Sequence, residues 1–72
     1  MEKKMNYGYV KSWDASKGFG FITTEDDDDL FVHVNDLDVT IKDKKLRQGQ
    51  KVAFDIRSEF KGDRAINVRL IK

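Results

Sequence analysis

The sequence predicts an all-β fold in which five short strands form a small closed or partly open barrel. Three observations favour it. Apolar and polar residues alternate with a period of two in five separate runs, which is typical of half-buried strands. No run has a 3.6-residue repeat long enough for a helix that would cover an open sheet. A barrel also removes the unpaired edges that an open sheet exposes.

The five expected strands differ in how they are connected. They span residues 7–14, 17–24, 29–34, 51–57 and 64–71. Short polar segments are expected as turns: Asp14–Ser16, Glu25–Asp29, and Ser58–Asp63, which closes the last hairpin with Gly62. The connection Asn35–Gly49 after the third strand is long. We expect it to hold one short helical turn with Asn35 as the N-cap.

Length and composition indicate a small single domain. The 72 residues predict residues 1–6 as a flexible tail and residues 7–72 as the folded part. The absence of cysteine excludes disulfides and thiolate metal sites, and it fits a reducing, cytoplasmic compartment. No apolar run approaches about 18 residues, and the N-terminus lacks the apolar segment of a secretion signal, so no membrane contact is expected.

The charges are nearly balanced but unevenly distributed. The chain has 14 Lys and Arg residues against 13 Asp and Glu, a net charge of +1. The acidic run Glu25–Asp29 carries much of the negative charge, so the rest of the chain is clearly basic. This run lacks the glycine and the terminal glutamate of a calcium loop. We expect it to be a solvated turn that repels phosphate.

Alternation assigns the apolar residues to two faces of the strands. The expected core is nearly all aliphatic: Val10, Ile22, Leu30, Val32, Val34, Val52, Phe54, Ile56, Ile66, Val68 and Leu70. The opposite face carries the rings and basic residues Phe19, Phe21, Phe31, Lys11, Lys17 and His33. Trp13 joins them on a plain alternation count, although a bulge in the first strand would change its face. Such a group of exposed rings marks a binding surface.

Rings interleaved with basic side chains predict binding of single-stranded nucleic acid, because bases stack on the rings and lysines neutralise phosphates. Three alternatives stay open. In the first, Phe19 and Phe21 belong to the core. In the second, the face that carries the rings joins the subunits of an oligomer. In the third, the same barrel is a protein-interaction module that uses the aromatic patch. His33 is the single histidine and no nucleophile motif accompanies it, so no enzyme, catalytic residue, metal site or cofactor is expected.

Two motifs resemble the RNA-binding signatures of the cold-shock domain family: KGFGFI at residues 17–22 and LFVHV at residues 30–34. The similarity continues in GYVKSWD, LRQGQKVAFDI and AINV, and it extends over nearly the whole chain. The resemblance implies a five-stranded antiparallel barrel of the OB type that binds single-stranded RNA and DNA with low sequence specificity. It also implies an RNA chaperone that affects transcription or translation.

The resemblance also implies which residues contact the ligand. Six coincide with ligand-contacting positions of the family: Lys11, Lys17, Phe19, Phe21, Phe31 and His33. Ser12 replaces the family's stacking tryptophan, and we include Trp13 in the site as a partial substitute. Lys61 and Arg64 of the last hairpin are expected to reach phosphate. Val34 replaces another ring, so weaker or shorter binding than that of a typical member is expected. We expect a monomer, with a strand-swapped dimer left open.

Overall fold

The structure, a computed structural model, describes residues 6–71 and contains five strands and one short 3-10 helix within them. The elements are β1 (Asn6–Asp14), β2 (Phe19–Thr24), β3 (Asp29–His33), η1 (Val34–Asp36), β4 (Lys51–Glu59) and β5 (Gly62–Leu70). The predicted all-β class and the five strands are confirmed. Asn6 begins β1, whereas the rest of the expected tail, residues 1–5, lies outside the described residues.

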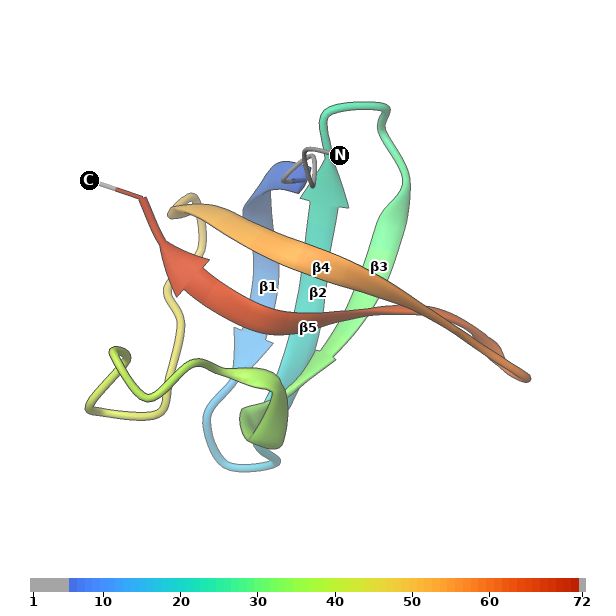
Figure 1. The fold of residues 1–72 in the computed structure, drawn as a ribbon. Coiled ribbons are helices and arrows are strands. Elements are labelled where there is room, and N and C mark those ends of the chain that lie inside the picture. The colour runs from blue at the N-terminus through green and yellow to red at the C-terminus, as the bar shows by residue number, and fades with distance from the viewer. Residues whose placement is uncertain (1–5, 72) are drawn as a thin grey trace.

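The strands form a closed barrel in the order β1-β2-β3-β5-β4. Figure 1 shows β1, β2 and β3 side by side, with the β4–β5 hairpin crossing over them. The pairings are antiparallel except between β3 and β5, where Phe31 lies opposite Arg64 in a parallel pair. The predicted antiparallel barrel is therefore confirmed except at this one pair. The reason is topological: β4 joins the barrel antiparallel to β1, so the returning β5 runs in the same direction as β3.

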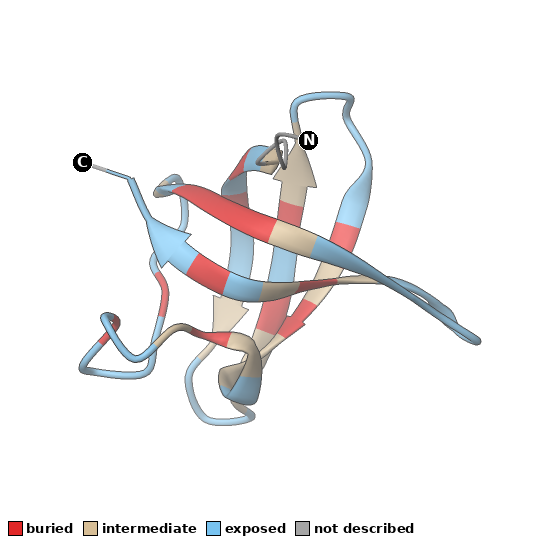
Figure 2. Ribbon diagram, in the orientation of Figure 1, coloured by how far each residue is buried: buried red, intermediate tan, exposed pale blue. Residues whose placement is uncertain are grey.

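The core fills the space between the three-stranded sheet and the crossing hairpin (Figure 2). Most of the predicted core is buried: Val10, Ile22, Leu30, Val32, Val52, Phe54 and Val68. The long connection adds three buried residues that the sequence did not reveal: Leu37, Ile41 and Leu46. Each stands among polar neighbours in a segment without strand or helix periodicity, so no repeat indicated a buried face. The connection therefore covers part of the core.

A bulge in β5 changes the side-chain alternation from the one predicted. Asn67 has a positive φ of 52°. Two residues of β5, Asn67 and Val68, stand opposite the single residue Phe54 of β4. The alternation shifts by one residue at this point. Ala65 is therefore buried, and Ile66, predicted to lie in the core, is only half-buried.

Three further residues predicted in the core lie at its margins instead. Ile56 is 43% exposed. Figure 2 shows that the half of β4 nearer the hairpin tip is exposed and extends away from the barrel. Leu70, 42% exposed, ends β5, where no facing layer covers it. Val34 is half-buried and belongs to η1 rather than to the third strand. The core is thus smaller on the hairpin side than the alternation predicted.

The predicted helical turn exists as η1, but its N-cap is His33 and not Asn35. His33 Nδ1 accepts a hydrogen bond from the backbone N–H of Asn35 at 3.1 Å. Asp36 Oδ2 in turn accepts the backbone N–H of His33 at 3.0 Å. This reciprocal capping explains why the turn begins earlier than expected, because Asp36 lies at the spacing needed to reach back to His33.

Candidate nucleic-acid interface

Three phenylalanine rings form a contiguous cluster on the outer face of β2 and β3, which we call the phenylalanine platform: Phe19, Phe21 and Phe31. Phe21 lies directly opposite Phe31, and Phe19 lies opposite His33. The ring centroids are 5.7 Å apart for Phe19 and Phe31, and 6.0 Å apart for Phe21 and Phe31. Phe31 is therefore the central ring. Phe21 is 39% exposed while the alternate residue Ile22 is fully buried, so the predicted outward direction is confirmed.

Gly20 allows the platform to form at a close approach between β1 and β2. It separates Phe19 from Phe21 and is buried. A Cβ at this position would lie 2.9 Å from the Cα of Trp13 and would overlap the carbonyl oxygen of Ser12. Any larger residue would push the two strands apart. Glycine therefore lets the flanking rings point outward while the backbone beneath them packs tightly on β1.

Trp13 lies on the other side of the sheet from the platform. The β1–β2 pairing contains a bulge between Val10 and Ser12, which reverses the alternation beyond it. The plain count that placed Trp13 outward is therefore wrong. Trp13 lies opposite the buried Gly20 and packs against the core, and its buried Nε1 has no hydrogen-bond partner among the described residues. Ser12, exposed and opposite Phe21, takes the position on the platform side.

Two tyrosines continue the aromatic surface along β1, and the sequence reasoning did not count them as site residues. Tyr9 is 52% exposed and lies opposite Thr23 of β2. Tyr7 is half-exposed, and Lys51 Nζ lies 5.9 Å from its ring centroid. Both tyrosines share the parity of Lys11, which was the available signal in the sequence. Tyr9 is the better candidate for stacking, because the ammonium of Lys51 already occupies one face of Tyr7.

Lys11 is held by a carboxylate beside the platform. Its Nζ lies 2.7 Å from Asp29 Oδ2, and Asp29 Oδ1 accepts the hydroxyl of Thr23 at 3.0 Å. The hydrogen bond from Lys11, followed by that from Thr23, lowers the pKa of the Asp29 carboxyl. The last residue of the acidic run thus belongs to β3, while residues 25–28 form an exposed turn. Lys11 is therefore already paired with a carboxylate in the free protein.

Lys17 and His33 lie at the end of the platform formed by Phe19. Lys17 is exposed and belongs to the turn at residues 15–18, not to β2 as predicted. Its backbone N–H donates to Asp14 Oδ1 at 3.2 Å, which fixes the turn. The half-buried ring of His33 uses Nδ1 as an acceptor for Asn35, so Nε2 is the nitrogen left to meet a ligand.

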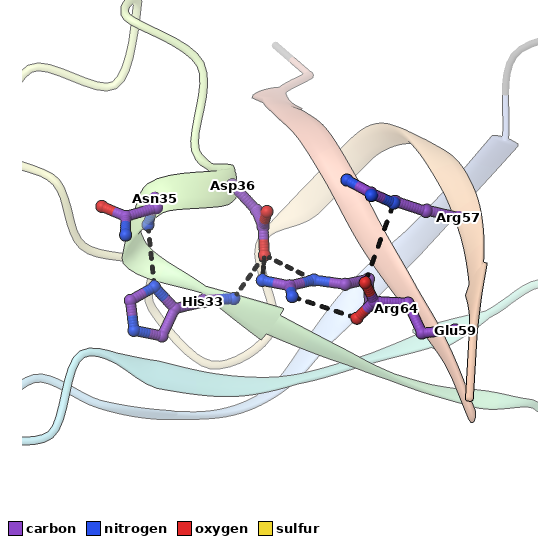
Figure 3. A network of polar contacts seen from close by, with 6 residues as sticks. All are labelled: His33, Asn35, Asp36, Arg57, Glu59 and Arg64. Carbon is purple, nitrogen blue, oxygen red and sulfur yellow. Dashed lines mark hydrogen bonds and ion pairs between the residues drawn. The ribbon is translucent and has the colours of Figure 1, made fainter. Parts of the chain in front are cut away.

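Arg64 is the centre of a polar network that joins β5 to η1 and β4 (Figure 3). Its Nε and Nη2 lie 3.2 Å and 2.5 Å from Asp36 Oδ2, and its Nη1 lies 3.1 Å from Glu59 Oε1. The hydrogen bonds to Asp36 and then to Glu59 raise the pKa of Arg64 above its ordinary value. Its Cζ also lies 5.6 Å from the ring centroid of Phe31. Two carboxylates therefore neutralise Arg64, which argues against the phosphate contact expected from the sequence.

An open hollow of about 390 Å³ adjoins the platform on the hairpin side. It is lined by Phe31, Glu59, Lys61, Gly62, Asp63 and Arg64. Lys61 is exposed and forms no ion pair with a carboxylate of residues 6–71. The hollow thus extends the surface of Phe31 toward the hairpin tip and offers one unpaired cation there.

Metal-ligand clusters and membrane-spanning helices are absent from residues 6–71. Within this range, no three histidine, cysteine, aspartate or glutamate side chains gather so that they could hold a metal ion. No helix in the described part of the chain is long and apolar enough to cross a membrane.

Comparison with known proteins agrees with a nucleic-acid-binding function. Residues 6–71 match the family described as the 'Cold-shock' DNA-binding domain. The major cold shock protein of Streptococcus pyogenes serotype M6 is 45% identical over 64 residues, which cover 89% of this chain and 94% of that protein. Cold shock protein 1 of Lactiplantibacillus plantarum is 48% identical over 64 residues, 89% of this chain and 96% of that protein. The cold shock-like protein of Aquifex aeolicus is 48% identical over 65 residues, 89% of this chain and 91% of that protein.

Proposed function

Because this chain belongs to the cold-shock domain family, whose domains bind nucleic acid and are not enzymes, we propose that it binds single-stranded RNA and DNA with low sequence specificity. The phenylalanine platform carries the proposal, because its three rings, joined through Phe31, lie on the outer face and are not part of the core. Bases stack on such rings whatever edges they present, so recognition is broad. Lys11 and Lys17 flank the platform, and we expect them to contact phosphates of the bound strand.

The free protein also limits the strength of binding. Ser12 supplies no ring beside the platform, and Val34 packs against the core. Lys11 must leave Asp29 before it can neutralise a phosphate. Three rings supply roughly 3–9 kcal/mol of stacking at about 1–3 kcal/mol per base. Part of this is offset by the ordering of the bound strand, so stacking alone gives dissociation constants no tighter than about the micromolar range.

A fluorescence anisotropy titration with labelled oligothymidine tests the platform. The double variant Phe19→Ala, Phe31→Ala removes two of three rings and should weaken binding by about 30-fold or more. Val39→Ala is the matched control, because Val39 is an apolar side chain outside the platform that is 79% exposed. Circular dichroism establishes that each variant is folded. A folded double variant with wild-type affinity would refute the stacking role.

Salt dependence separates this function from a second candidate, a protein-interaction module that uses the same rings. The pairing of Lys11 and Arg64 with carboxylates favours the second candidate, because it leaves fewer cations for phosphate. Phosphate binding should weaken linearly on a log–log plot, with a slope of about −0.7 per neutralised phosphate on single strands. An apolar protein contact should barely respond. Binding of oligothymidine that is absent or insensitive to salt would favour the protein module.

We further propose that the protein acts in the cytoplasm as a monomeric RNA chaperone. A base that stacks on the platform is unavailable for pairing, so the protein should trap the open form of weak RNA hairpins. The melting temperature of a short labelled hairpin should fall as wild-type protein is added, and it should stay constant with the Phe19→Ala, Phe31→Ala variant. If the hairpin melts unchanged in the presence of protein that binds oligothymidine, the chaperone role is wrong.

A further inference from the structure

The tip of the β4–β5 hairpin carries an aromatic ring that the fold does not use. Phe60 has a relative exposure of 109%, so no other side chain covers it. β4 ends at Glu59 and β5 begins at Gly62, which leaves Phe60 and Lys61 as the two-residue tip. The backbone does not require a ring there, because the positive φ of 130° falls on Gly62 and hairpin tips favour small polar residues. Neither packing nor the turn conformation therefore explains why residue 60 is aromatic.

The hairpin tip continues the surface of the phenylalanine platform. Phe31, the central ring, lies opposite Arg64, and the hollow extends from Phe31 to Lys61 and Gly62. The two residues from Arg64 to Gly62 advance about 7 Å along the strand. Figure 1 shows the hairpin reaching past β3 and away from the barrel, so a strand that leaves Phe31 on this side soon meets the tip.

The cation beside the ring favours nucleic acid as the occupant, and the exposed carboxylate of Asp63 in the same lining is the charge that a phosphate would have to avoid. Lys61, next to Phe60, forms no ion pair with a carboxylate in the described part of the chain, in contrast to Lys11 and Arg64. A ring beside an unpaired ammonium matches a base beside its phosphate. We propose that Phe60 stacks on a base next to the phosphate contact already expected of Lys61, so that the two residues form a hairpin-tip contact. The site then extends beyond the platform to the hairpin tip, an inference that rests on the proposed single-strand binding.

Oligonucleotide length tests the hairpin-tip contact. Phe60→Ala should weaken binding of an oligothymidine of about ten nucleotides by about tenfold, and should leave one of about four nucleotides unchanged, because the platform alone holds it. The variant should keep the wild-type melting temperature, since Phe60 packs on nothing. Phe60→Trp should restore the loss, whereas Phe60→Leu, which is apolar but has no aromatic face, should not. Lys61→Gln should reduce the salt slope by about 0.7 with the long oligomer only.

The outcomes distinguish this inference from the proposed function. Phe21→Ala, a change within the platform, should weaken both lengths. If wild-type protein binds neither length, both proposals fail. If it binds both and Phe60→Ala does so with equal affinity, the hairpin-tip contact is refuted and the platform stands. Equal weakening of both lengths also overturns the contact, as does full rescue by Phe60→Leu, which would indicate an apolar protein contact at the tip instead.

Discussion

The ion pair between Asp36 and Arg64 should contribute more to stability than an ordinary surface pair. The two side chains are 12% and 26% exposed. The pair therefore lies between exposed pairs, worth about 0–1 kcal/mol, and buried pairs, whose disruption costs about 3–5 kcal/mol. Three N–H donors, two from Arg64 and the backbone N–H of His33, converge on one oxygen of Asp36. Asp36→Asn keeps the shape and removes the charge, so it should lower the free energy of unfolding by about 2 kcal/mol.

Thermal and urea denaturation measure this loss. A domain of this size melts about 4–8 °C lower per kcal/mol, so Asp36→Asn should lower the melting temperature by about 8–16 °C. A double-mutant cycle with Arg64→Met, which keeps the aliphatic stem, should give a coupling energy of about 1–2 kcal/mol. Arg57→Gln is the control, because its 3.7 Å pair with Glu59 is exposed and should be worth under about 0.5 kcal/mol. A coupling energy below about 0.5 kcal/mol would refute the reasoning, since Asp36 would then act only as a cap.

Gly20 and the acidic residues allow three further tests. Gly20→Ala should lower the free energy of unfolding by about 3 kcal/mol, because its Cβ meets the β1 backbone. Gly49→Ala is the control, because Gly49 has a φ of 89° but no neighbouring atoms that a Cβ would meet. In the same urea titration it should lower the free energy of unfolding by only about 1–2 kcal/mol. If the two variants lose equal free energy of unfolding, the close approach at Gly20 is not the cause. Replacing Asp26–Asp28 by asparagine should raise affinity for oligothymidine at low salt and leave it unchanged near 1 M salt, where the screening length is about 3 Å. A gain that persists at high salt would exclude long-range repulsion. The hydrogen bond from Lys11 lowers the pKa of the Asp29 carboxyl from its ordinary value of 3.8. The ionised carboxylate therefore stabilises the fold fully above pH 3.8, and this stabilisation is lost as the pH falls through the lowered pKa. Asp29→Asn should therefore make the urea midpoint less sensitive to pH between about pH 5 and pH 2, and an unchanged profile would contradict this.

The strands and the platform could be predicted from the sequence because both follow from a period of two. Phe19, Phe21 and Phe31 share their parity with basic residues, and a buried face would not carry those charges. Their outward direction therefore did not depend on any contact between distant segments. The same argument identified most of the core.

The errors arose where the backbone departs from simple alternation. The bulge in β1 reversed the side of Trp13, and the bulge in β5 replaced Ile66 by Ala65 in the core. Neither bulge is marked by glycine at its position, so no local signal was available. The polar network of Arg64 could not be predicted from the sequence either. Asp36 lies 28 residues away along the chain, and the parallel pairing of β3 and β5 brings it next to Arg64.

That parallel pairing is the seam at which the barrel is closed. Between β3 and β5 the register contains one pair, Phe31 and Arg64, and a parallel bridge between Leu37 and Val68 follows it, whereas the other neighbouring strands pair over four or more positions. Closing the seam brings distant parts of the chain together, so it is entropically costly and should form late in folding. A nucleic-acid strand that lies on Phe31 and the hairpin tip would contact both β3 and β5, the two strands that this pairing joins. Occupancy should then suppress the breathing of the barrel, seen as slower amide hydrogen exchange in β3 and β5 than in the free protein.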